Sequence, residues 1–208
     1  MCERHDNFGF QKNVNGGMAE YMLYPKGAIV HAVPDSVPIE EAIVVKPLSC
    51  SVNAADRGRI GNDDVVVVAG AGTLEHARRL GADLTLNTRD VDAVAEVKRL
   101  TGGYSCDVFI EATGYPPMVN MGMQMIRKLG RLVQFSVFSG ETTLDWSIIG
   151  DRKELDIYGA HLGPYTYPRA IRYVADRTID VRGIVTHQFP LEGWLRSLRN
   201  DAKRRRIA

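Results

Sequence analysis

The stretch VVVVAGAGTLEHARRLGADLTLN, residues 65–87, decides how the fold of this 208-residue chain is interpreted. Four valines followed by Gly70-Ala71-Gly72 are typical of a buried strand that turns sharply into a helix, as at the start of a dinucleotide-binding unit. The fingerprint of such units, G-x-G-x-x-G, has a third glycine that lets the helix pack closely on the strand, but Glu75 stands at that position. A carboxylate also has the wrong charge for a neighbour of a phosphate.

The segment after this turn is too short for a complete unit. Eight residues, 73–80, separate Gly72 from Gly81, whereas a parallel crossover takes about a dozen or more. The next expected strand, Leu84–Leu86, ends in Asn87 rather than in the acidic residue that holds the ribose hydroxyls. We therefore interpret the stretch as the end of one strand–helix element joined to the end of a later one. The Gly-Ala-Gly turn stays open to two interpretations, a phosphate-binding turn and a plain strand-to-helix turn.

Apolar strands alternate with amphipathic helices along the rest of the chain. This order predicts an α/β fold with a parallel sheet and helices on both of its faces. We expect strands at 65–69, 84–86, 108–111, 132–138 and 155–160, and helices at 74–80, 91–100, 118–129 and 167–175. Residues 39–60 have helical spacing on both sides of Pro47, which we expect in the first turn of a second helix. Residues 17–34 alternate apolar runs with Pro and Gly, as in the small strands of a β-rich module.

The composition argues against several classes of function. The 26 basic and 25 acidic residues leave a net charge of +1, so no field attracts nucleic acid or an anionic membrane, and we expect a small-molecule partner. No apolar run approaches the ~18 residues of a membrane helix. Cys2, Cys50 and Cys106 lack paired spacing, which favours reduced thiols and the cytoplasm. We interpret the basic run Lys203–Arg206 as a solvated tail rather than as a nucleic-acid patch.

Seven stretches occur in the order seen in zinc-dependent medium-chain alcohol dehydrogenases, which the sequence therefore resembles. They are NFGFQKNVNGGMAEYM (7–22), KPLSCSVNA (46–54), VVVVAGAG (65–72), CDVFIEATG (106–114), MIRKLGRLVQFSVF (125–138), DWSIIGDRKELDIYGAHLGPY (145–165) and GIVTHQFPLE (183–192). The chain looks most similar to the branch that oxidises erythritol, L-threitol and other polyols. The resemblance covers the chain from residue 1 to about residue 195.

The resemblance implies a GroES-like catalytic domain, a Rossmann domain, a zinc ion that polarises the substrate alkoxide, and NAD or NADP as hydride acceptor. It divides the chain into three parts. Residues 1–45 are a remnant of the catalytic domain, and residues 46–180 are an incomplete Rossmann-like domain. Residues 181–208 are a return segment with an aberrant basic tail. The strand end that discriminates NAD from NADP is missing.

The resemblance also implies which residues contact the cofactor. They are Gly70, Ala71, Gly72, Ala112, Thr113, Phe135, Ser136 and Val137, the last three facing the nicotinamide carboxamide. Simpler interpretations remain open: residues 111–114, which match the family's segment beside the cofactor, also suit a strand end with a Thr-Gly turn, and residues 135–137 a buried strand.

Four departures from the family pattern fall on functional parts. The cysteine, the Gly-His-Glu motif and the proton relay that serve the catalytic zinc have no match here. Cys2 matches one cysteine of a structural zinc lobe whose other three are missing. Lys46 replaces a glutamate that can approach the zinc in polyol-type relatives. The fourth is the join after Gly72. We therefore assign no catalytic residue and predict no metal site.

We expect a fragment of an NAD(P)-dependent zinc-type polyol dehydrogenase whose catalysis is impaired. The alternative is a non-catalytic remnant limited to weak nucleotide binding or self-association. Trp146 and Ile148–Ile149 lie in the segment that pairs subunits or bridges domains in the family, which suggests a homo-oligomer.

Overall fold

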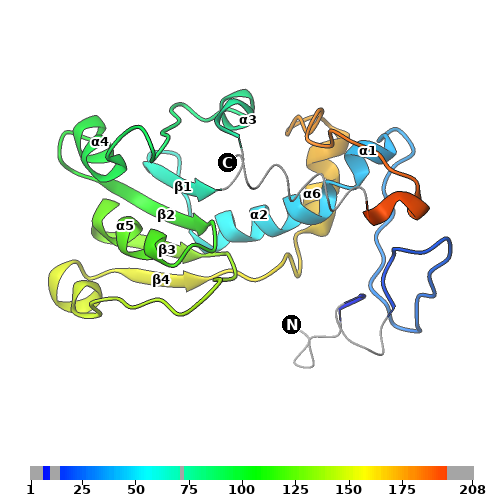
Figure 1. The fold of residues 1–208 in the computed structure, drawn as a ribbon, viewed down its shortest axis with the longest axis horizontal. Helices are drawn as coiled ribbons and strands as arrows, with labels where there is room; N and C mark the ends of the chain where they lie inside the picture. Colours follow the sequence, from blue (N-terminus) through cyan, green and yellow to red (C-terminus); the bar gives the residue numbers. More distant parts are fainter. Residues whose placement is uncertain (1–6, 10–14, 71–72, 196–208) are drawn as a thin grey trace. The chain divides into compact units, whose positions relative to one another are not determined.

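The computed structural model describes the chain except for residues 1–6, 10–14, 71–72 and 196–208. Its contacts separate two units, which are coloured along the sequence in Figure 1: the sheet unit, Ser36–Val181, and the terminal unit, Met1–Asp35 with Arg182–Ala208. The predictions that concern Cys2, Ala71, Gly72 and the basic tail fall outside the described residues. Within the described part, no helix is long and apolar enough to cross a membrane.

Four parallel strands form the core of the sheet unit. They are β1 (Val66–Gly70), β2 (Cys106–Ala112), β3 (Ile126–Gln134) and β4 (Asp156–Gly159), and they lie side by side in the order of the sequence (Figure 1). The register places Val67 beside Phe109, Phe109 beside Leu132, and Leu132 beside Ile157. The predicted parallel α/β class is confirmed.

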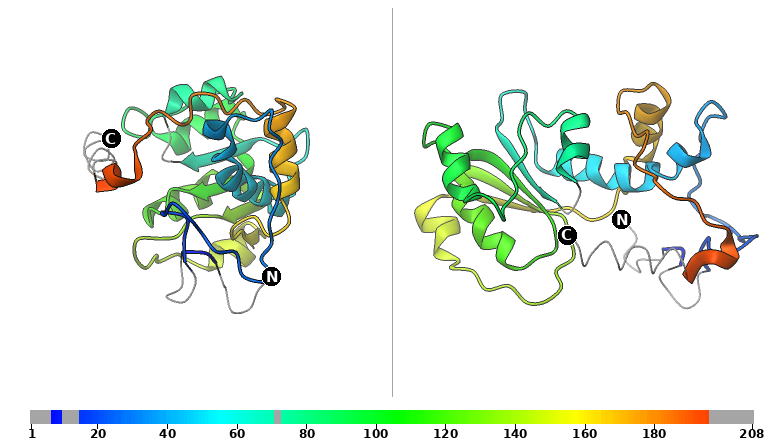
Figure 2. Two further views of the ribbon diagram at one scale, coloured as in Figure 1. Left: turned by 90° about the vertical axis from the view of Figure 1, so that its right-hand side faces the viewer. Right: turned by 45° about the horizontal axis from the view of Figure 1, so that its top comes forward.

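Helices cover the two faces of this sheet, as Figure 2 shows from two further directions. On one face, α4 (Ala93–Leu100) and α5 (Pro117–Met125) bury a cluster that includes Val97, Phe109, Met123 and Leu132. On the other face, Ala54 of α2 (Val45–Arg57) packs on Val108, Ile110 and Val133. Because neighbouring residues of a strand point to opposite faces, the continuous apolar runs of β2 and β3 serve both layers.

The helix boundaries follow local signals in the sequence. Pro47 stands in the first turn of α2, where its missing N–H needs no partner, as predicted. Asp92 caps α4, because its Oδ1 accepts from the N–H groups of Val94 and Ala95 at 3.0 and 3.1 Å. The remaining helices of this unit are α1 (Ile39–Ala42), α3 (Leu74–Arg79), α6 (Tyr167–Ala175) and the π-helical turn Ile148–Arg152. Of these, α6 has the predicted bounds.

The expected helix 118–129 is wrong beyond Met125, because β3 begins at Ile126. The ammonium group of Lys153 donates to the carbonyls of Met123 and Ile126 at 2.6 and 2.5 Å, and so takes up backbone acceptors where the helix ends. Leu129 then adopts a positive φ of 58° and donates its N–H to the carbonyl of Lys153 at 2.8 Å. These contacts come from a distant segment, which the local apolar pattern does not reveal.

Three further expectations are wrong. Leu84–Leu86 makes no strand, because no ladder joins these residues to the sheet, although Leu86 packs against the core. The expected strand 132–138 ends at Gln134, so Phe135–Val137 forms a loop beyond β3 instead of a buried strand. Residues 17–34 contain no strand in the described chain.

The terminal unit consists mostly of irregular backbone where it is described. It holds a short 3-10 helix, Leu191–Gly193, and small aromatic contacts such as the edge-to-face pair of Phe8 and Tyr24, with ring centroids 5.6 Å apart. Large apolar side chains of this unit are exposed, Met18, Tyr21 and Leu23 among them.

Candidate nucleotide-binding site

The carboxyl ends of three neighbouring strands bring most of the predicted cofactor residues together at one end of the sheet. Gly70 ends β1 beside Ala112, which ends β2, and Glu111 lies beside Gln134 at the end of β3. The loops 112–114 and 135–137 continue from these ends. In open α/β sheets, ligands bind in the crevice outside the carboxyl ends of the strands. The structure therefore brings Gly70, the 112–114 loop and the 135–137 loop to one candidate crevice.

Glu111, which the sequence analysis names only as the first residue of the segment 111–114, joins two of these loops. Its side chain is fully buried, and its Oε1 accepts from the N–H groups of Thr113 at 2.8 Å and Gly114 at 3.1 Å. The hydroxyl of Thr113 also donates to Oε1, and the hydroxyl of Ser136 donates to Oε2. A buried carboxylate is costly unless hydrogen bonds satisfy it, and here the two loops provide them. In the sequence, the feature that could have indicated this role is an acidic residue inside the apolar run VFIEA, residues 108–112.

The backbone strengthens the connection between the same two loops. The carbonyl of Glu111 accepts from the N–H groups of Phe135 and Ser136 at 3.1 and 3.2 Å. Gly114 has a positive φ of 71°, and a Cβ at this position would lie 2.4 Å from the carbonyl oxygen of Val137. We call residues 111–114, the end of β2 with the loop that follows it, and the loop 135–137 together the two-loop platform. Its hydrogen bonds and close backbone contact hold it in one arrangement.

The platform offers mainly backbone and apolar surface to a ligand. Val137 is 89% exposed, whereas the hydroxyls of Thr113 and Ser136 point to Glu111. Among the residues that the structure describes, none beyond its chain neighbours has an atom within 4 Å of the Cβ position of Gly70, which leaves room for a ligand close to the backbone there. A flat group that is held by backbone contacts, such as a nicotinamide, fits these features.

The β1 side of the crevice does not fit a pyrophosphate equally well. The helix that follows β1, α3, has only six residues, and the hydroxyl of Thr73 already accepts from the N–H of His76 at 3.3 Å. Glu75 adds an exposed carboxylate in the first turn of the same helix. Ala71 and Gly72, the rest of the predicted phosphate turn, lie outside the described residues.

The donor set does not fit a zinc ion. Among the described residues, no three side chains of His, Cys, Asp or Glu come together as metal ligands would. Cys50 and Cys106 are both buried, and burial raises the pKa of Cys106 to about 12, so its thiol stays protonated. Lys46 is exposed in the first turn of α2 and offers a cation instead of a carboxylate. These described side chains would not hold a catalytic zinc ion.

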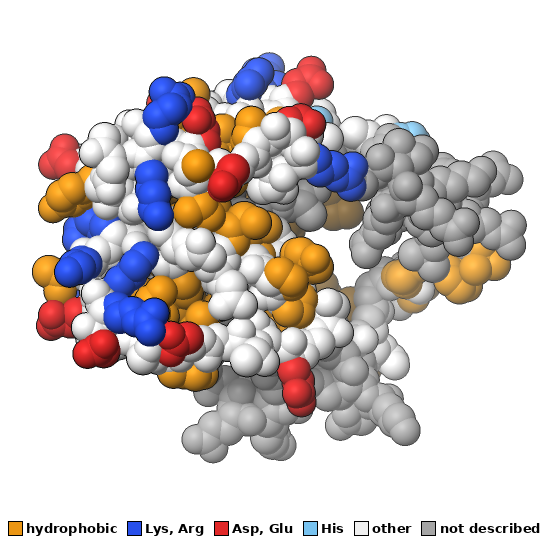
Figure 3. Space-filling model, turned by 60° about the vertical axis from the view of Figure 1, so that its left-hand side comes forward, with side chains coloured by type: hydrophobic (Ala, Val, Ile, Leu, Met, Phe, Trp, Pro, Cys, Tyr) orange, Lys and Arg blue, Asp and Glu red, His pale blue; other side chains and the backbone are white. Residues whose placement is uncertain are grey.

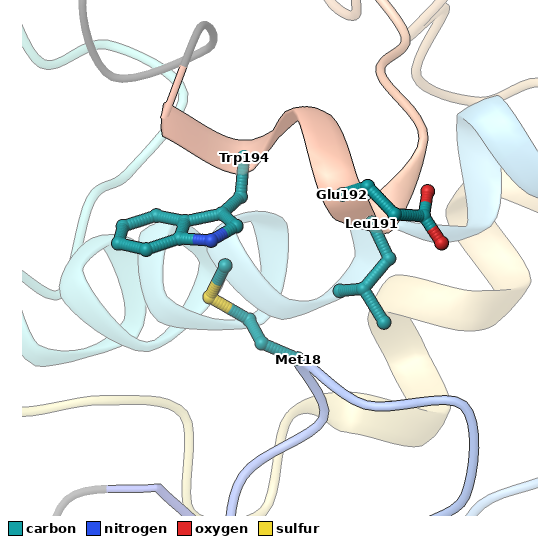
Figure 4. Close-up of a pocket in the computed structure, with 4 residues that line it drawn as sticks. All are labelled: Met18, Leu191, Glu192 and Trp194. Atoms are coloured by element: carbon teal, nitrogen blue, oxygen red, sulfur yellow. The ribbon is translucent and has the colours of Figure 1, made fainter.

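A separate open cavity of about 520 Å³ lies within the terminal unit and is lined by Met18, Leu191, Glu192 and Trp194. Figure 4 shows the side chains of Met18 and Trp194 facing one another, with the carboxylate of Glu192 directed away from them. The lining is apolar apart from this carboxylate and the indole nitrogen, so it does not contain an acid–base pair.

On the face of the molecule in Figure 3, basic and acidic side chains are interspersed among apolar patches.

Comparisons with known proteins give the family to which this chain is similar. The sequence profile described as "Zinc-binding dehydrogenase" matches residues 50–176. The erythritol/L-threitol dehydrogenase of Mycolicibacterium smegmatis is 42% identical over 95% of this chain and 62% of that protein. The sorbitol dehydrogenase of Bacillus subtilis is 29% identical over 86% of this chain and 58% of that protein. The chain thus spans about three fifths of the length of these relatives.

The same alignments show that the relatives contain internal residues that this chain lacks. The alignment with the Mycolicibacterium smegmatis enzyme has 224 positions, but 95% of 208 residues is only about 198, so about 26 positions have no counterpart here. With the Bacillus subtilis enzyme, 206 positions compare with about 179 residues, a difference of about 27. That these positions belong to the short connection after Gly72 stays a prediction.

Solved structures show the same fold at low sequence identity. An Escherichia coli oxidoreductase/dehydrogenase of unknown specificity superposes with a TM-score of 0.87 at 17% identity, over 97% of this chain and 65% of that one. A zinc-binding dehydrogenase of Sinorhizobium meliloti, bound to NADP, superposes with a TM-score of 0.78 at 20% identity, over 86% and 61%.

Proposed function

Because the chain belongs to the zinc-binding dehydrogenase family, we propose that it is the nucleotide-binding portion of an NAD(P)-dependent polyol dehydrogenase whose catalysis is impaired. The observation that carries the proposal is the contrast within one crevice: the two-loop platform is intact, whereas the pyrophosphate side is incomplete and the donors do not fit zinc. We propose a cytoplasmic setting, in line with the two buried free thiols, Cys50 and Cys106.

The residues of the platform would hold the nicotinamide half of the cofactor. In relatives that bind NAD or NADP, the nicotinamide ring supplies the hydride acceptor. In this chain, Phe135–Val137 would provide backbone contacts and the apolar side chain of Val137, while Glu111 keeps the two loops in register. Binding is weak, because the six-residue α3 with its exposed Glu75 gives the pyrophosphate little support.

Polyol oxidation by this chain alone is not expected, for a reason of magnitude. A zinc ion contributes several kcal/mol to stabilisation of the developing alkoxide, and each ~1.4 kcal/mol changes the rate about tenfold. Loss of the pyrophosphate contacts also removes the orientation that hydride transfer needs. Both losses act on the same chemical step.

The test is NADH or NADPH formation by the purified chain with erythritol, L-threitol or sorbitol, in the presence of added zinc. We expect no rate above that of a sample without protein. Steady cofactor reduction that a chelator abolishes would contradict the proposal, because it would show a working zinc site. A matched Gly114→Ala variant, in which the platform is disrupted, serves as a control for any rate that does appear.

A further inference from the structure

We propose that the free edge of β1 pairs antiparallel with β1 of a second copy of this chain, so that two four-stranded sheets join into one. This interaction surface runs along β1, whose last residue, Gly70, also lies at the candidate crevice. It differs from the segment around Trp146 that the sequence analysis considered for self-association.

The backbone of β1 has hydrogen-bonding groups without a partner strand. In the described sheet β1 is the first strand and pairs only with β2. The carbonyl of Val65 accepts from the N–H of Asp107 at 2.9 Å, so Val65 faces β2. Since successive residues of a strand direct their backbone groups to alternate edges, Val66 and Val68 direct their N–H and C=O groups to the free edge.

The side chains of β1 are those of a central strand, although the strand lies at an edge. The run 65–70 is VVVVAG, without the lysine, proline or inward charge that usually protects an edge strand. Val68 is 61% exposed, whereas Ile110, its neighbour in register on β2, is buried. The helix α2 covers this face over β2 and β3, but it leaves Val68 uncovered.

No further strand lies beyond β1 in the described part of the chain. Relatives carry about 26 aligned positions that have no counterpart here, and the predicted strand nearest in sequence, Leu84–Leu86, does not join the sheet. Leu84 is 62% exposed.

A second copy fits this edge for two reasons. Each outward residue offers both a donor and an acceptor, so the same edge run antiparallel is its own complement, as an isologous contact requires. The charges at the two ends of β1 are also opposite. Asp63 precedes the strand, whereas α3 beyond it carries the exposed Arg78, and Arg79, whose guanidinium lies 3.9 Å from Asp180 of the same chain, against one glutamate. Antiparallel pairing brings the acidic end of one copy toward the basic end of the other.

The area buried by this contact indicates how tightly the dimer should associate. With five residues in β1, the pairing buries less than the roughly 800 Å² per partner of a standard stable interface. We therefore expect a reversible, concentration-dependent dimer that dissociates on dilution, rather than a permanent one.

The experiment is sedimentation velocity of the full chain at concentrations from about 5 to about 500 µM. This hundredfold range should bracket the Kd of a weak dimer. Val68→Lys places a charge on the proposed pairing strand, at a side chain that is 61% exposed. Ile157→Lys places the same charge on β4, the opposite edge of the same sheet. Circular dichroism and urea unfolding of both variants establish that the fold is retained.

We expect the wild-type chain and Ile157→Lys to dimerise with rising concentration, and Val68→Lys to weaken the association at least tenfold. Amide exchange at Val66 and Val68 should slow as the dimer forms, because these N–H groups gain acceptors. A monomer at every concentration, growth into unlimited aggregates, or a dimer that only Ile157→Lys disrupts would overturn the proposal.

Discussion

Replacing Glu111 by alanine removes the group that joins the two loops of the platform. The change deprives the buried N–H of Gly114 and the hydroxyls of Thr113 and Ser136 of their acceptor. A hydrogen bond to a charged group contributes about 1.5–3 kcal/mol, and an unpaired buried donor costs about 1–3 kcal/mol. The substitution also removes the desolvation cost of a buried carboxylate without a cation, which offsets part of this loss of stability. We expect Glu111→Ala to lower the free energy of unfolding by about 2–4 kcal/mol.

Glu111→Gln separates the hydrogen bonds from the charge. The amide oxygen of glutamine can accept from Thr113 and Gly114 as Oε1 does, and the hydroxyl of Ser136 can turn to accept from the amide nitrogen. We therefore expect this variant to lose only about 1 kcal/mol.

The assay is urea unfolding followed by far-ultraviolet circular dichroism at pH 7. Glu141→Ala is the matched control, because Glu141 is an exposed carboxylate of the same unit, and its loss should change stability by less than about 0.5 kcal/mol. If Glu111→Ala is as stable as this control, the buried carboxylate does not hold the platform together and the reasoning fails.

Two other changes test neighbouring contacts. Gly114→Ala should destabilise the chain by about 2–4 kcal/mol in the same urea assay, because a Cβ there meets the carbonyl of Val137 in a left-handed backbone conformation; an unchanged midpoint would show that the loops move apart easily. Burial raises the pKa of Asp107, but the N–H of Val65 and the guanidinium of Arg127 outweigh it, so the net pKa is lowered. A lowered pKa stabilises the fold above about pH 4, and that contribution is lost as the pH falls through the folded-state value. Asp107→Asn should therefore be less stable than the wild type at pH 7, and the difference should shrink between pH 4 and pH 2; a constant difference would contradict this assignment.

The sequence predicts elements that have a strong local signal. The helix 167–175 follows from the periodicity of its apolar residues, and it is observed. The first-turn position of Pro47 follows from the missing N–H of proline, and it is also observed. The boundary between α5 and β3 was missed, because the apolar run near Met125 suits a helix and a strand alike, and Lys153 decides it from a distance. Leu84–Leu86 has a strand composition but lacks a partner strand, which only tertiary structure reveals.

The candidate site was predictable where the family resemblance supplied it. The positions 112–113 and 135–137 came from motifs, and the structure places both loops at one edge of the sheet. The role of Glu111 was not predictable from spacing, since its partners at 113–114 and 136 lie on two loops that only the parallel pairing of β2 and β3 brings together. The contribution of these residues to cofactor binding remains a prediction.

The most direct test of the proposed function is a titration of the ¹⁵N-labelled chain with NADH, followed through its backbone amide signals. We expect the amides of Thr113, Gly114, Ser136 and Val137 to shift with a Kd in the millimolar range, and reduced nicotinamide mononucleotide to shift the same set. AMP, which lacks the nicotinamide, should leave them unchanged. Unshifted platform amides at saturating NADH, or shifts that AMP reproduces, would contradict the proposal that this chain retains the nicotinamide half of a dehydrogenase cofactor site.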